Sequence, residues 1–161
     1  MLRESIRKVM VVMLCVLSFS MMSCSQADPV FHDTDGKAVQ LKKLRGKWVV
    51  VNYWASWCGG CIQEIPELNH FYKDHQNDDV VFLGVNFDQL PPEVLRDAIA
   101  RTAITFPVLI GDPNPVWRLG EVDVLPTTFI INPKGRVVKQ IVGPNTEASL
   151  QNELQALQAA G

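Results

Sequence analysis

The sequence contains few of the residue types that bind metal ions. Four cysteines and three histidines occur among its 161 residues. Two of the cysteines, Cys15 and Cys24, lie near the N-terminus, far along the chain from Cys58 and Cys61. Because a structural zinc site takes four ligands, the composition gives little support to a zinc-binding protein.

Positive charge is also scarce. Lysine and arginine number 15 against 17 aspartates and glutamates, which gives a net charge of −2. Proteins that bind nucleic acids or anionic membrane surfaces through charge carry a basic excess. Neither a nucleic acid nor a charged lipid surface is therefore expected as an electrostatic partner.

The apolar stretch near the N-terminus is too short to span a membrane. Val9 to Met22 is a run of 14 uncharged residues, whereas a transmembrane helix needs about 20. Three basic residues, Arg3, Arg7 and Lys8, precede it. A basic start followed by a short apolar run is typical of a secretory signal peptide, so we expect the protein to be exported.

The end of this run, Met21-Met22-Ser23-Cys24, resembles the lipobox of bacterial lipoproteins. The resemblance implies that residues 1–23 are removed and that lipid is attached to Cys24. Residues 24–29 would form a tether to a single domain, residues 30–161. The mature part would have 138 residues, 12 of them basic and 16 acidic. The alternative is an ordinary signal peptide that is cleaved near Ala27.

Cys58 and Cys61 stand two residues apart at a predicted junction between a strand and a helix. An apolar run, Trp48 to Trp54, precedes them, and apolar residues then recur at helical spacing. These positions are Ile62, Ile65, Leu68 and Phe71. Cys58 would lie at the helix entrance, where unpaired N–H groups and the helix dipole favour a thiolate. The Cys-x-x-Cys pair alone is compatible with redox chemistry or with metal binding.

The order of predicted elements indicates an α/β fold with a central mixed sheet. A hairpin is expected within Val30–Leu41, because Asp33-Thr34-Asp35-Gly36 is a turn sequence. The predicted strands are Trp48–Tyr53, Val80–Val85, Phe106–Ile110, Thr127–Asn132 and Val137–Val142. One helix is predicted directly after Cys58, and three more are predicted over Pro92–Thr102, Val116–Gly120 and Glu147–Ala160.

Several motifs together resemble the TlpA/ResA/CcmG branch, also called DsbE-like, of the thioredoxin fold. They are Trp57-Cys58-Gly59-Gly60-Cys61 after a buried strand, Pro66, Leu125-Pro126-Thr127-Thr128-Phe129, and the strand and helix inserted between Val80 and Thr102. The resemblance implies a thioredoxin-like fold with an N-terminal β-hairpin and a central βα insertion. Members of this branch are membrane-tethered extracytoplasmic thiol–disulfide oxidoreductases.

The resemblance also implies roles for the two cysteines. Cys58 would be the exposed attacking thiol, and Cys61 the buried thiol that resolves the mixed disulfide. The alternative is an inert Cys58–Cys61 staple, which would close too small a loop to add much stability.

Other site residues follow from the same resemblance. Pro126 matches the family's cis-proline, beside which the Leu125 backbone would face a bound peptide. Trp57, Gly59 and Gly60 would contact the substrate, whereas Trp54 is expected in the core. An ordinary loop proline is the alternative for Pro126.

Glu64 matches an acid that ResA-type proteins carry near the cysteine pair, and Asn52 stands where thioredoxin has a buried acid. A half-buried carboxylate would have a raised pKa and could relay the proton of Cys61. The alternative is a solvated glutamate on the helix surface.

The sequence thus predicts an enzyme that reduces disulfides of exported proteins, without cofactor or metal. By resemblance, its electron donor would be a DsbD/CcdA-like membrane protein, and its substrate could be apocytochrome c. One alternative is a disulfide oxidase or isomerase of the same fold. Another is a copper chaperone, although Sco-type proteins use Cys-x-x-x-Cys with a distant histidine.

Overall fold

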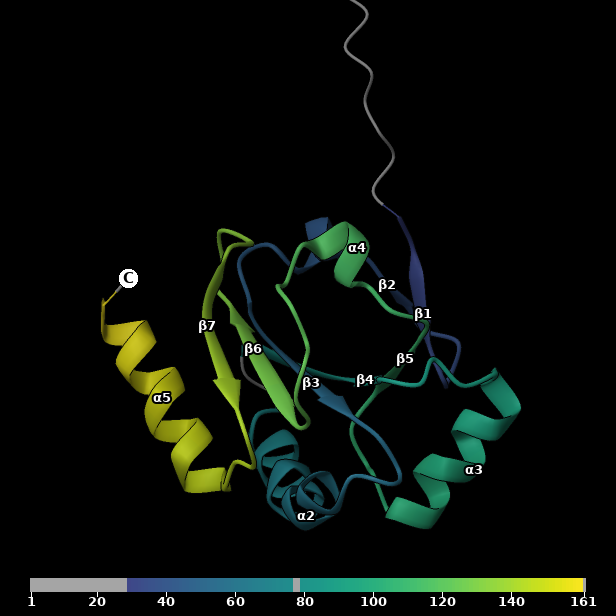
Figure 1. The fold of residues 1–161 in the computed structure, drawn as a ribbon. Helices are drawn as coiled ribbons and strands as arrows, with labels where there is room; N and C mark the ends of the chain where they lie inside the picture. Colours follow the sequence, from purple (N-terminus) through teal and green to yellow (C-terminus); the bar gives the residue numbers. More distant parts are fainter. Residues whose placement is uncertain (1–28, 77–78, 161) are drawn as a thin grey trace, which may run out of the picture.

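The computed structural model describes residues 29–76 and 79–160 (Figure 1). The predicted signal peptide, Cys24 and most of the predicted tether lie outside the described residues. Within the described part, no helix is long and apolar enough to cross a membrane.

The described residues form one seven-stranded sheet in the order β2-β1-β5-β4-β3-β6-β7. The strands are β1 (Phe31–Asp33), β2 (Ala38–Val39), β3 (Trp48–Trp54), β4 (Val80–Asn86), β5 (Val108–Ile110), β6 (Thr127–Ile131) and β7 (Val137–Val142). The helices are the short 3₁₀ helix η1 (Leu41–Leu44), α2 (Gly59–Asp74), α3 (Pro92–Thr102), α4 (Asn114–Trp117) and α5 (Glu147–Ala160).

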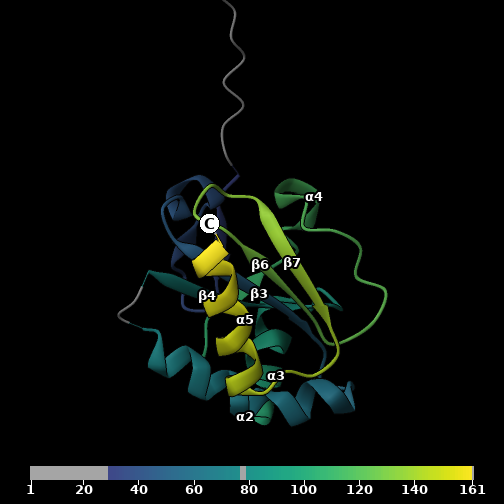
Figure 2. The ribbon, with the colours of Figure 1, turned by 90° about the vertical axis from the view of Figure 1, so that its left-hand side faces the viewer.

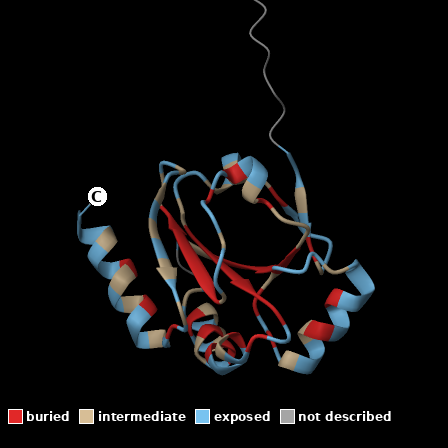
Figure 3. Cartoon of the chain, viewed as in Figure 1, coloured by how far each residue is buried: buried red, intermediate tan, exposed pale blue. Residues whose placement is uncertain are grey.

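Strand β3 lies in the interior of the sheet, parallel to β4 on one side and antiparallel to β6 on the other. Its side chains alternate between two cores, with Val50 and Trp54 in one and Val51 and Tyr53 in the other. A strand covered on both faces needs apolar residues on both, which explains the unbroken apolar run in the sequence. Figure 3 shows this buried centre in red.

Helices α2, α3 and α5 cover one face of the sheet, and η1 and α4 lie on the other (Figure 1). The start of α5 lies beside α2, as Figure 2 shows, and is bonded to it, because the Glu147 N–H donates to Glu67 Oε2 at 2.9 Å. Helix α2, which begins between the two cysteines, is therefore packed against the sheet and tied to the last helix.

The expected fold class is confirmed, including the N-terminal hairpin β1–β2 and the inserted β4–α3 unit. The short helix α4 starts at Asn114 rather than at Val116. Asp112 Oδ1 accepts the Asn114 N–H at 2.9 Å and the Tyr53 hydroxyl at 2.7 Å, so the helix begins next to an anchored carboxylate. It ends at Trp117, where Arg118 takes a left-handed backbone conformation.

Ile62 lies in α2, as the helical spacing predicts, but its side chain is 39% exposed. Apolar residues three apart drift around a helix that has 3.6 residues per turn. The buried face of α2 instead follows Cys61, Ile65 and Leu68, and it includes Glu64.

Candidate active site

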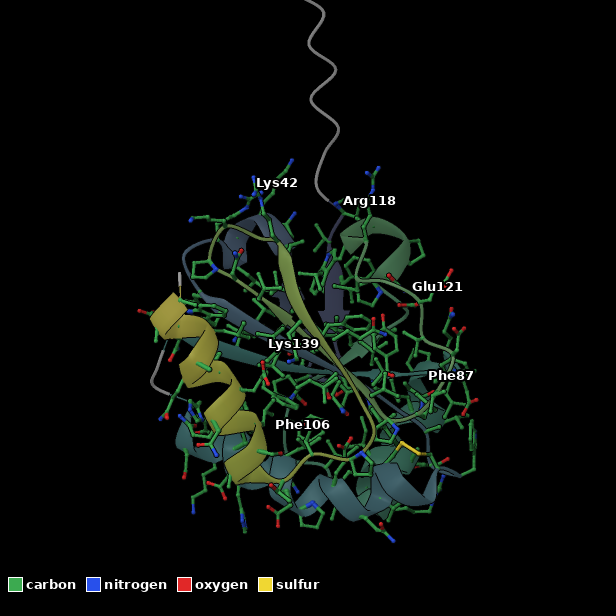
Figure 4. All side chains as sticks on the ribbon, turned by 60° about the vertical axis from the view of Figure 1, so that its left-hand side comes forward. Lys42, Phe87, Phe106, Arg118, Glu121 and Lys139 are labelled. Carbon is green, nitrogen blue, oxygen red and sulfur yellow. A yellow bond between two sulfur atoms is a disulfide. The ribbon has the colours of Figure 1, made fainter. Side chains whose placement is uncertain are left out.

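The two cysteines form a disulfide at the entrance of α2, with their Cα atoms 5.2 Å apart. Cys58 is the N-cap residue, and its Sγ accepts the backbone N–H of Cys61 at 3.1 Å. Figure 4 shows the yellow S–S bond next to the first turn of this helix. Position 58 therefore faces unpaired helix donors, as the sequence predicts. Among residues 29–76 and 79–160, no three His, Cys, Asp or Glu side chains come together as a metal site.

Cys58 is less accessible than expected. In the disulfide form it is 7% exposed, whereas Cys61 is fully buried. Cys58 belongs to the same buried cluster as Trp54 and Ala55, which explains its low exposure. Cys58 is still the more accessible of the two cysteines, so an incoming thiol or disulfide meets it first.

Pro126 lies beside the cysteine motif and follows a cis peptide bond, as the resemblance implies. A Cβ atom placed on Gly60 would be 3.4 Å from Pro126 Cδ, which puts the buried proline ring against the motif. The Pro126 carbonyl accepts the Gly143 N–H at 2.9 Å, so the loop after β7 reaches the same place. Leu125 is half-buried next to it.

Trp57 projects into solvent with 66% of its surface exposed, whereas Trp54 is buried in the core. The Trp57 indole N–H donates to Asp88 Oδ2 at 2.9 Å. Phe87, next to Asp88, is 42% exposed. Asp88 and Phe87 were not singled out in the sequence. They follow β4, and the ends of parallel neighbours β3 and β4 meet at one edge of the sheet, which is the signal that could have found them.

Glu64 is 2% exposed, so it is more deeply buried than the half-buried position expected, and it is not a solvated surface residue. Its Oε1 accepts a hydrogen bond from Asn52 Nδ2 at 2.8 Å, and its Oε2 accepts the Asn145 N–H at 2.8 Å. The two predicted polar residues of the site, Glu64 and Asn52, are thus brought into direct contact.

Two further residues complete this buried polar network: Thr128, which the sequence offered only as part of the motif Leu125–Phe129, and Asn145, which was not singled out. Thr128 Oγ1 accepts from Asn52 Nδ2 at 3.1 Å and from Asn145 Nδ2 at 3.2 Å. Asn52 lies on β3, Glu64 on α2, Thr128 on β6 and Asn145 in the loop before α5. The network therefore ties four parts of the chain together next to the cysteine pair.

Burial raises the pKa of Glu64 from 4.5 to about 7, and the hydrogen bonds from Asn145 and Asn52 oppose part of this rise. A carboxyl group with this pKa holds or releases a proton near neutral pH. It lies three residues after Cys61 on the same helix, and residues at that spacing share a face. The arrangement can therefore exchange a proton in the surroundings of the buried thiol.

The chain matches the Redoxin family model over residues 19–156. Thiol-disulfide oxidoreductase ResA of Bacillus subtilis (strain 168) is 35% identical over 123 residues, which are 76% of this chain and 68% of the relative. ResA of Geobacillus thermodenitrificans (strain NG80-2) is 35% identical over 130 residues, covering 81% and 74% of the two chains.

The chain is also similar to solved structures of thioredoxin-fold proteins. StoA from Bacillus subtilis superposes with a TM-score of 0.67 at 26% identity, over 78% of this chain and 95% of StoA. A thioredoxin-family thiol:disulfide interchange protein from Chlorobium tepidum TLS gives 0.68 at 25% identity, over 80% and 92%. Fold, disulfide geometry and relatives agree, and the chain therefore belongs to the redoxin family as a ResA-like thiol–disulfide oxidoreductase.

Proposed function

We propose that Cys58 and Cys61 are the redox-active pair of this enzyme. The observation that carries the proposal is the Cys58–Cys61 disulfide at the entrance of α2, where Cys58 Sγ accepts the Cys61 N–H. In the reduced protein the same N–H and the helix dipole stabilise a thiolate on Cys58. That thiolate attacks a substrate disulfide, forms a mixed disulfide and releases one substrate thiolate.

Cys61 then resolves the mixed disulfide. Its thiolate attacks Cys58 Sγ, the bond to the substrate breaks, and the second substrate thiolate leaves while the Cys58–Cys61 bond forms. The carboxylate of Glu64 takes the proton that Cys61 must lose. The raised pKa of Glu64 supports this role, because it allows the group to accept and return a proton near neutral pH.

Substrate contacts surround Cys58. The exposed Trp57 ring provides apolar surface, and Gly59 and Gly60 leave the approach to the sulfur free of side chains. The Leu125 backbone next to Pro126 would pair with an extended substrate segment. A bound peptide would thus lie between Trp57 and Leu125, with its disulfide over Cys58.

The proposed direction is reduction of disulfides in exported proteins. A carboxylate at Glu64 opposes a nearby thiolate by like-charge repulsion, which raises the tendency of the dithiol to give up electrons. A DsbD/CcdA-like membrane protein would restore the dithiol, and the Cys-x-x-Cys-His haem sites of apocytochrome c are the proposed substrates.

The proposed location is the extracytoplasmic face of the membrane, which in a bacterium with two membranes is the periplasm. The sequence of residues 1–23 supports export, and the lipobox-like residues support a lipid anchor on Cys24. Residues 24–29 would join this anchor to the redox domain at residues 30–161. A labelled fatty acid that is incorporated into the wild type but not into Cys24→Ser would establish the anchor.

Capture of natural partners tests the proposed function. A Cys61→Ser variant in the native host should retain substrates on Cys58 as mixed disulfides that a thiol reagent releases. Exported proteins with oxidised Cys-x-x-Cys-His sites should be found among them, and the double variant Cys58→Ser/Cys61→Ser should retain none. Adducts that lack any exported cysteine protein would contradict the proposed substrate class.

A further inference from the structure

Gly60, the second central residue of the cysteine motif, is enclosed by two proline rings. A Cβ atom on Gly60 would lie 3.2 Å from Pro144 Cγ and 3.4 Å from Pro126 Cδ. A Cβ on Gly59 would meet nothing within 4 Å. A side chain at position 60 would therefore press against the Pro144 ring, whereas a side chain at position 59 would not.

Pro144 is held in place from both sides. The residue before it, Gly143, donates its N–H to the Pro126 carbonyl at 2.9 Å. The residue after it, Asn145, donates its N–H to Glu64 Oε2 at 2.8 Å. The exposed ring therefore cannot retreat from Gly60 without loss of a backbone hydrogen bond to the site.

Gly60 needs such an external restraint because of its position in the chain. Glycine restricts its own backbone less than any other residue does. Gly60 directly precedes Cys61, whose N–H reaches Cys58 Sγ at 3.1 Å. The distance between the two sulfurs in the reduced protein consequently depends on how well the backbone at Gly60 is held.

We propose that Pro144 is a positioning residue for the thiol–disulfide exchange: its ring restrains Gly60 and keeps Cys61 close to Cys58. The inference rests on the proposed roles of these two cysteines. The restraint raises the effective concentration of one thiol at the other, which favours closure of the Cys58–Cys61 bond and release of the substrate.

The equilibrium with glutathione measures this effective concentration. Oxidised glutathione converts the dithiol to the disulfide and yields two molecules of reduced glutathione. Pro144→Ala removes the ring atoms that face Gly60 and should lower the equilibrium constant of this reaction about fivefold. A general effect of proline on the unfolded chain alters thermal stability but not this constant, so an unchanged constant would overturn the proposal.

An added methyl group tests the contact itself. Gly60→Ala should slow reduction of insulin by the dithiol about tenfold relative to Gly59→Ala, because it places an atom against Pro144. Pro144→Ala combined with Gly60→Ala should bring the rate back to that of Pro144→Ala alone, because the added methyl group then meets no ring. Equal rates for the two glycine variants, or no recovery in the double variant, would show that the contact does not position the motif.

A failure of the proposed function can be told apart from a failure of the role of Pro144. If the wild-type protein does not equilibrate with glutathione, the proposed function of the cysteine pair fails. If it does, and Pro144→Ala behaves like the wild type, the role of Pro144 alone is refuted.

Discussion

The side-chain amide of Asn52 donates a hydrogen bond of 2.8 Å to the carboxyl group of Glu64, and neither side chain reaches solvent. The bond joins the central strand β3 to the helix that carries the cysteines. A neutral amide faces the acid here, so the protonation of Glu64 is not coupled to a second acid in this pair. In the oxidised protein, whose disulfide does not titrate, Glu64 is therefore the titratable group of this network.

Glu64→Gln should change how stability depends on pH. The pKa of Glu64 is raised from 4.5 to about 7 in the folded protein, so between these values the folded protein retains a proton that the unfolded chain has lost. Stability from this group is fully present below the lower value and is lost as the pH rises toward the upper one, by on the order of 3 kcal/mol. The free energy of urea unfolding of the oxidised protein at both ends of this range measures the loss. A variant that lost stability as steeply as the wild type would contradict the assignment.

Asn52→Asp should make the stability of the folded protein strongly dependent on pH. Two carboxyl groups at hydrogen-bond distance share one proton, since both cannot be ionised without repulsion. We expect the variant to be about 2 kcal/mol less stable than the wild type in mildly alkaline solution and close to it in mildly acidic solution. Urea unfolding under both conditions checks this, with Asn52→Ala as the uncharged control. An Asp variant that behaved like the Ala variant throughout would show that Glu64 carries no charge there.

Trp57→Ala should impair the reaction with protein substrates more than it impairs stability. The exposed ring contributes little to the core, so the free energy of unfolding should change by less than about 1 kcal/mol. The KM for a protein disulfide should rise about fivefold, because an aromatic anchor is lost. Trp57→Phe keeps an aromatic ring but loses the hydrogen bond to Asp88. Its KM should therefore lie between the KM of the wild type and that of Trp57→Ala. A KM unchanged in Trp57→Ala would remove Trp57 from the substrate surface.

Gly84→Ala should destabilise the sheet. A Cβ atom at this position of β4 would lie 2.8 Å from Phe106 Cε2 and 3.1 Å from Val108 Cγ2. Overpacking of this kind costs about 1–3 kcal/mol, which denaturant unfolding can resolve. Adding Phe106→Leu shortens the opposing side chain and should return part of the loss. If Phe106→Leu only adds its own loss of stability to that of Gly84→Ala, the clash with Phe106 is not the cause of the destabilisation.

The elements that local patterns determine could be predicted from the sequence. The apolar run of β3, the hairpin turn at Asp33-Thr34-Asp35-Gly36 and the helix α5 depend on neighbouring residues, and the structure confirms them. The position of Cys58 at a helix entrance follows from the same local logic.

The polar network around Glu64 could not be predicted in this way. Asn145 contacts Glu64 across 81 residues of sequence, and Thr128 contacts Asn52 across 76. Only the folded sheet brings them together, and no local spacing marks them. The burial of Glu64 itself had a signal in the sequence, because Glu64 lies four residues before Leu68, a spacing that puts both residues on the same face of α2.

The role of Cys58 as the attacking thiol is tested most directly by its reaction with an aromatic disulfide reagent whose released thiolate absorbs visible light. The reduced Cys61→Ser variant should keep the aromatic group as a stable mixed disulfide, which peptide mapping should locate on Cys58. The wild type should release both aromatic thiolates and end with the Cys58–Cys61 bond. A Cys58→Ser variant that formed its adduct on Cys61 faster than Cys61→Ser forms one on Cys58 would contradict the account.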